Sequence, residues 1–336
     1  MTPHRGSALG AATFLLALAS VAAADLRWRG ENLSERGIHK GAGLPLFHLN
    51  IDGAHGSFAG LGISAGAPPG TIYWGFYQQY YGAGTLRDDR GDEVDLRFQL
   101  DSYALVQRIF VLTPLQTTFV QHYVEAIPIV LASDFTIGGI AESTAGFGDL
   151  GLGTGLLFPD TYRSKWLEAE AMAGVDVFLP TGHYRPGGLH NLSFDTYSYL
   201  LWSDLIFHLP RFGNGLYVSP AFYLAGSTDN DDFQNPVTGS HSTYRFAPAY
   251  QQLLTVLYHV SSRWSVGFEG FFDFQLADDR LDGSRIHGSV ERGRMLGPLV
   301  TAAFGRLLVD VSVLREFEAR NRPEGTRVTA ILYVVF

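Results

Sequence analysis

The sequence predicts an all-β protein, a transmembrane antiparallel β-barrel of the bacterial outer membrane with about twelve strands. Three observations support this fold class: long segments of alternating apolar and polar residues, connections that alternate between short and long, and an alternating last segment that ends on Phe336. In the segment 167–179, every odd position from Leu167 to Leu179 is apolar. A period of two is the pattern of a strand with two different faces.

Twelve segments are predicted as strands, many of them longer than the roughly five or six residues of an average globular strand. They are 71–82, 96–111, 117–132, 146–158, 165–179, 192–209, 215–226, 243–259, 263–276, 292–304, 306–317 and 326–336. Every second connection is short, as at 112–116 and 260–262, whereas others, such as 133–145 and 318–325, are longer and polar. Short periplasmic turns and longer outer loops are typical of outer-membrane barrels. Backbone groups in lipid need internal partners, so the sheet should close.

The composition excludes several other classes. The chain has 336 residues, of which 46% are hydrophobic and only 17% charged, so it does not have the composition of a disordered protein. It has no cysteine, which excludes disulfides, cysteine-ligated zinc and thiol catalysis. The net charge of −9 argues against a nucleic-acid partner, which would call for a basic surface.

The N-terminus is predicted to be an export signal. Residues 1–24 combine a short basic start, an apolar stretch over 8–19 and small residues at 22–24, as in a cleaved secretory signal peptide. After residue 24 no stretch of about 20 residues is apolar throughout, so the sequence predicts no membrane-spanning helix. The strand pattern favours the Gram-negative outer membrane over the periplasm. Residues 25–70 form a Gly-rich segment that either hangs in the periplasm or plugs the barrel, and 71–336 form the barrel itself.

The polar side of the strands is expected to face the barrel lumen. The residues predicted to line the channel are Asp149, Glu168, Glu170, Asp176, Arg245, His259, Glu269, Asp273, Asp310 and Glu316. One interpretation is a set of ion pairs that brace the lumen and fix the strand register. The other is an electrostatic filter that favours cations or neutral solutes over anions, and the two can both hold.

Other chemistry has little support in the sequence. Ser240, His241 and Ser242 lie in a predicted outer loop and could contribute to a Ser-His site, but no third orienting group accompanies them. The histidines show no spacing typical of a metal site. We therefore expect no catalytic residue, no metal and no cofactor, and hence no enzyme. Aromatic residues near strand ends, including Trp166 and Trp264, are expected in the interfacial girdle.

Several separated motifs resemble a known family, the exported proteins named for the MetA-pathway of phenol degradation, which include SphA-type outer-membrane proteins. The motifs are Ala67-Pro68-Pro69-Gly70 with Tyr73, Tyr77 and Tyr81, then Gly146-Phe147-Gly148-Asp149, then Pro180-Thr181-Gly182-His183-Tyr184, and finally Glu316-Phe317 with Ala319, Asn321-Arg322-Pro323 and Gly325. The last of these is the most specific, and together they extend over most of the chain from about residue 67.

The resemblance implies an outer-membrane barrel that moves hydrophobic or aromatic small molecules, and it does not imply an enzyme. The leading hypothesis is therefore a channel for passive uptake of such solutes. The alternatives are a structural or surface-interaction barrel with a blocked lumen and an outer-membrane lipid hydrolase. Expected partners are outer-membrane lipid and lipopolysaccharide, the barrel-assembly machinery that reads the terminal Phe336, and the solutes themselves. The acidic outer loops are either solvated or bridged to anionic lipopolysaccharide by divalent cations.

Overall fold

The computed structural model describes residues 67–117, 119–188, 191–212, 215–234 and 239–336. The predicted signal peptide and nearly all of segment 25–70 lie outside these residues. The described strands are β1 (Ile72–Arg87), β2 (Phe98–Gln116), β3 (Gln121–Ile127), β4 (Ile129–Ile137), β5 (Ile140–Phe147), β6 (Leu150–Arg163), β7 (Glu168–Leu179), β8 (Ser198–Leu209), β9 (Leu216–Ser227), β10 (Tyr244–Arg245), β11 (Ala249–His259), β12 (Trp264–Gln275), β13 (Arg280–Leu281), β14 (Ser284–Arg285), β15 (Arg292–Phe304), β16 (Leu307–Arg320) and β17 (Arg322–Val335).

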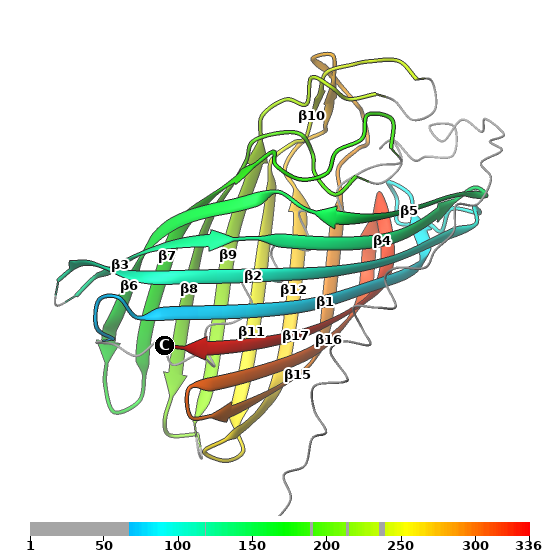
Figure 1. Ribbon diagram of the computed structural model, residues 1–336. Coiled ribbons are helices and arrows are strands. Elements are labelled where there is room, and N and C mark those ends of the chain that lie inside the picture. The colour runs from blue at the N-terminus through cyan, green and yellow to red at the C-terminus, as the bar shows by residue number, and fades with distance from the viewer. Residues whose placement is uncertain (1–66, 118, 189–190, 213–214, 235–238) are drawn as a thin grey trace, which may run out of the picture.

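The large sheet is a closed antiparallel barrel (Figure 1). Its strands follow the order β1-β17-β16-β15-β12-β11-β9-β8-β7-β6-β3-β2-β4-β5, and β1 also pairs with β2, which closes the circle. We call each full-length element of the barrel wall a stave. The strands β3 and β4 together form one interrupted stave, and β5 and β6 form another, so the fourteen strands of this sheet make twelve staves. The predicted fold class is confirmed. Among the residues that the structure describes, no helix is both long and apolar enough to cross a bilayer.

Two staves are interrupted where the sequence predicted continuous strands. Pro128 separates β3 from β4, since a proline cannot donate to the ladder. Gly148 and Asp149 separate β5 from β6. Above this break β5 pairs only with β4 among the described strands, whereas β6 pairs with β7 from Leu150 downward. The free edge of β5 is covered by the segment 180–197, from which His183 donates its backbone N–H to the Phe147 carbonyl at 2.9 Å.

Three predicted boundaries are wrong for local reasons. The predicted strand 243–259 divides into β10 and β11 around Pro248, and β10 joins β13 and β14 in a separate three-stranded sheet at the outer end. The predicted outer loop 133–145 is a tight turn at Gly138 and Gly139, both with positive φ. The predicted loop 318–325 is a tight turn at Asn321, with φ of 52°, because β16 and β17 extend through its polar residues.

The two faces of the barrel wall differ as an outer-membrane barrel requires. Alternate side chains are buried, and they meet across the interior: Arg322 on β17 reaches Asp273 on β12 although β16 and β15 lie between those strands. The opposite positions are exposed and apolar, as at Val311, Val313 and Phe317 on β16. An apolar outer band of this kind faces lipid. A site that binds a small molecule from water is therefore confined to the inward face or to the two ends of the barrel.

Candidate functional site in the barrel interior

One side of the interior carries a network of ion pairs, which we call the charged wall. It consists of the inward side chains of β12, β16 and β17: Glu269, Asp273, Asp310, Glu316, Arg322 and Arg327. Arg322 lies 2.9 Å from Asp273 and 2.8 Å from Glu316, measured between nitrogen and oxygen. The Tyr81 hydroxyl donates to the other Glu316 oxygen at 2.6 Å. These contacts compensate most of the desolvation of the charges.

A second charged group lies on β2 and β3, which are neighbours, and on β7, which β6 separates from β3. Arg108 donates through two nitrogens to both oxygens of Glu125, and Asp176 lies on the same inward face, fully buried. The Arg108 guanidinium also lies 4.9 Å from the ring of Trp202 on β8. Tyr123 reaches toward Trp202 across β6 and β7, where Gly155 and Gly174 leave room that a Cβ atom would fill. Arg108, the two carboxylates and the two aromatic rings thus form one buried cluster on the inward face of the barrel.

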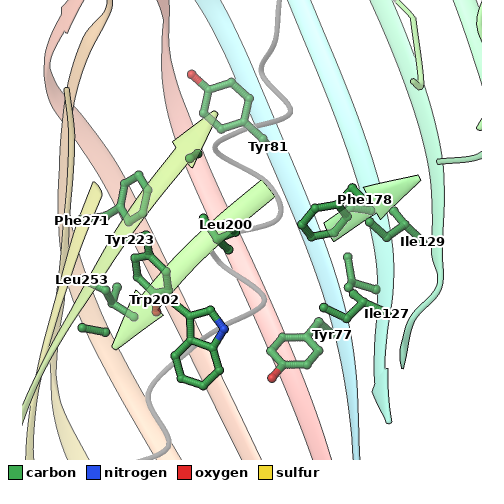
Figure 2. Packing of buried hydrophobic residues seen from close by; sticks show 14 of the residues in the cluster. Tyr77, Tyr81, Ile127, Ile129, Phe178, Leu200, Trp202, Tyr223, Leu253 and Phe271 are labelled. Carbon is green, nitrogen blue, oxygen red and sulfur yellow. The ribbon is translucent and has the colours of Figure 1, made fainter. Parts of the chain in front are cut away.

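Another part of the interior, separated from β17 by β1, is mainly apolar, and we call it the apolar wall. Above Arg108, the inward side chains of β2 and β4 are apolar except for the paired Ser102 and Ser133, and the wall consists of the apolar ones: Phe98, Leu100, Ala104, Val106, Ile129, Leu131, Phe135 and Ile137. The rings of Phe98 and Phe135 meet edge to face at 5.7 Å between centroids. Figure 2 shows Ile127, Ile129 and Phe178 pointing into the interior from neighbouring strands. The sequence interpretation missed this wall because it assigned polar residues to the lumen throughout.

Three of the predicted lining residues lie near the periplasmic end of the interior. Glu168 accepts from, or pairs with, Nδ1 of His208 at 2.9 Å, and the His208 ring stacks on Tyr217 at 4.3 Å. His259 contacts the Ser265 hydroxyl at 2.8 Å. Glu170, His208 and His259 are partly exposed, unlike the charged wall. These side chains form a hydrated mouth rather than part of the buried network.

Two other predicted lining residues have different positions. Asp149 is buried at the break between β5 and β6, where it accepts from the Gly182 backbone N–H at 3.0 Å and so fixes the segment 180–197. Arg245 lies on β10, outside the barrel wall, contrary to the sequence interpretation, because the strand stops at Pro248. Its guanidinium bonds to Asp229, and this hydrogen bond holds the pKa of the Asp229 carboxyl below its usual value.

The remaining candidates form no recognisable centre. Ser240 and His241 are exposed in an outer loop next to Ser242. Within the described ranges, no group of three or more His, Asp or Glu side chains is placed to hold a metal ion.

The family model for the MetA-pathway of phenol degradation matches residues 68–332. The chain belongs to this family. A search of curated proteins finds no match. Among solved structures, the chain is similar to the COG4313 outer membrane channel from Pseudomonas putida F1, with a TM-score of 0.70, 18% identity, and coverage of 82% of this chain and 98% of that one.

A weaker likeness is to the transport unit of the autotransporter AIDA-I from Escherichia coli, with a TM-score of 0.46, 9% identity, and coverage of 83% and 95% of the two chains. At 18% identity, the likeness to the COG4313 channel establishes the barrel fold and nothing finer.

Proposed function

We propose that this protein is an outer-membrane channel through which small, mainly hydrophobic or aromatic molecules enter passively. The observation that carries the proposal is the apolar wall. A water-filled pore for hydrophilic solutes has a polar interior all round. Here β2 and β4 place mainly apolar side chains on the inward face, including the fully buried Leu100. Contact with lipid does not require this, because lipid contacts only the outward face. The family description and the similar channel from Pseudomonas putida point to the same class of function.

The apolar wall and the charged wall have different roles in such a channel. An apolar solute gains from leaving water along the apolar wall, by roughly 25 cal/mol for each Å² of apolar surface covered. Apart from Asp310, the charged groups of the charged wall and of the Arg108–Glu125 pair are held in ion pairs, so the solute need not solvate them. In the charged wall four carboxylates face two guanidiniums. We expect this excess to disfavour anions, so that neutral aromatics pass more readily than aromatic carboxylates.

Segment 25–70 determines the resting state in this proposal. If it occupies the lumen as a plug, the channel is closed to ions until the segment moves. If it hangs in the periplasm, the channel is open at rest. The barrel itself spans the outer membrane in either case, with its short turns and the end of β17 on the periplasmic side.

The test is uptake of phenol and toluene by vesicles that contain the mature full-length chain and carry lipopolysaccharide in the outer leaflet, because plain phospholipid passes such molecules unaided. Protein-dependent uptake of neutral aromatics, with little uptake of glucose, would support the proposal. Absence of both fluxes would overturn it. Ion conductance that arises only after deletion of residues 25–66 would instead support the alternative of a structural barrel with a blocked lumen.

A further inference from the structure

The two ends of the barrel carry opposite charge. The outer connections are rich in carboxylates, as at Asp88, Asp89 and Asp92. The short turns at the other end carry basic side chains, and all of those that follow are exposed: Arg163, Lys165, Arg211, Arg263 and Arg306. Because short turns are periplasmic in outer-membrane barrels, this basic rim lies at the level of the inner leaflet.

Two neighbouring turns bring three of these side chains together in what we call the Trp166 cluster, namely Lys165, Trp166 and Arg211. The first two lie in the turn between β6 and β7, and Arg211 lies in the turn between β8 and β9. The Arg211 guanidinium carbon is 3.2 Å from the centroid of the Trp166 ring, and the Lys165 ammonium is 5.3 Å from it. The ring thus holds two cations close together.

The charges of the Trp166 cluster are not used within the described barrel. Neither Lys165 nor Arg211 forms an ion pair with a carboxylate of the described ranges, whereas nearby Arg163 lies 3.6 Å from Glu168. Trp166 keeps 52% of its surface exposed, and Tyr162 and Phe212 beside it are also exposed. A pair of cations on an exposed aromatic ring is suited to an anion outside the protein.

We propose that the Trp166 cluster binds the phosphate group of an anionic phospholipid in the inner leaflet. The guanidinium and the ammonium both donate charge-assisted hydrogen bonds to phosphate oxygens. The tryptophan ring is amphipathic and belongs at the membrane interface. Outward-facing Leu152 and Leu156 on β6 lie above the cluster, toward the bilayer centre, and offer apolar surface to the acyl chain. The inference rests on the proposed outer-membrane location and is independent of what the channel passes.

The experiment measures lipid selectivity of the reconstituted full-length mature chain with spin-labelled phosphatidylglycerol and phosphatidylcholine. We expect a clear preference of the protein-bound lipid population for phosphatidylglycerol, of about five-fold for each cation in contact. The double variant Lys165→Gln/Arg211→Gln should lose that preference. The matched control Arg263→Gln/Arg306→Gln removes two charges from other periplasmic turns and should keep it.

Three results would overturn the proposal. The wild-type chain could show no preference for phosphatidylglycerol, or both double variants could lose it equally, which would mean diffuse charge rather than a site. Inorganic phosphate could also bind the cluster in detergent, detected by phosphorus NMR, while phosphatidylglycerol shows no preference in the bilayer. Solute uptake is measured on the same preparations. Lost lipid selectivity with normal uptake would count against the lipid site alone, and lost uptake with normal selectivity would count against the channel alone.

Discussion

The charged wall and the apolar wall lie in one barrel with only β1 between β17 and β2, but their side chains follow different patterns. On β12, β16 and β17 the inward side chains include the charged network but also apolar residues such as Phe271, Leu314 and Ile331. The outward side chains of their central parts are apolar, as contact with lipid requires. On β2 and β4 the inward side chains above Arg108 are mainly apolar, whereas the outward ones are mixed and range from Leu105 and Val130 to Asp101 and Asp134. An inward apolar side chain is stabilised when an apolar group covers it in place of water, because removing apolar surface from water is favourable. The inward face of the barrel is therefore not uniformly polar, and the proposed path for apolar solutes rests on this difference.

The largest expected effect comes from breaking the charged wall. Arg322→Met leaves Asp273 and Glu316 buried without their counter-charge and should lower the free energy of unfolding by about 3–5 kcal/mol. The measurement is urea unfolding in phospholipid vesicles followed by tryptophan fluorescence. The control is Arg315→Met on the outward side of β16, where the side chain is 62% exposed and 3.8 Å from Glu324. Its loss should stay below about 1 kcal/mol. Equal losses for the two variants would contradict the network.

The apolar wall is tested by placing a polar group in it. Leu131→Asn puts an unsatisfied amide on the path of an apolar solute and should reduce uptake of toluene about ten-fold. Leu131→Met preserves volume and apolarity and should leave uptake within about two-fold. Both variants are first checked for the heat-modifiable migration of a folded barrel. Uptake that is insensitive to Leu131→Asn would mean that solutes do not follow this wall.

The charge excess of the charged wall leads to a smaller effect on selectivity. Asp310 is buried and has no guanidinium partner among its described contacts, so Asp310→Asn removes a negative charge without leaving a buried cation unpaired. We expect benzoate uptake to rise by a factor of about three to ten, from the lost repulsion of roughly 1 kcal/mol, while phenol uptake stays unchanged. The control Glu318→Gln lies at the outer end of β16, beside Arg294. A parallel change in benzoate and phenol uptake would refute electrostatic selection.

The smallest effect is expected outside both walls. Arg245 lowers the pKa of Asp229, so their bond favours the folded outer sheet above the ordinary aspartate pKa and is lost as the pH falls through the lowered value. Asp229→Asn removes this dependence on pH. Because both side chains are exposed, neither solute uptake nor the unfolding temperature at pH 7 should change measurably. A strong effect on uptake would place the outer sheet in the solute path.

The sequence was sufficient for the barrel and for much of the charged wall, because strict alternation over 264–276 and 308–317 identifies both faces of a strand. Asp273, Asp310 and Glu316 all lie on the inward face. The apolar wall was missed because the alternation over 98–101 and 134–137 is reversed there, with apolar side chains inward and polar ones outward. Arg245 was misplaced because the period of two continues past Pro248, where the backbone leaves the sheet. The tight turn at Asn321 was hidden by polar residues that resemble a loop.

The central claim is that solutes travel along the apolar wall, and the absence of cysteine from the chain permits a direct test. Single cysteines at Leu131 on the apolar wall and at Ser312 on the charged wall are reacted with an aromatic thiol reagent, with and without excess phenol. The account predicts that phenol slows the reaction of Leu131→Cys much more than that of Ser312→Cys. Equal protection at both positions, or protection only at Ser312→Cys, would contradict it.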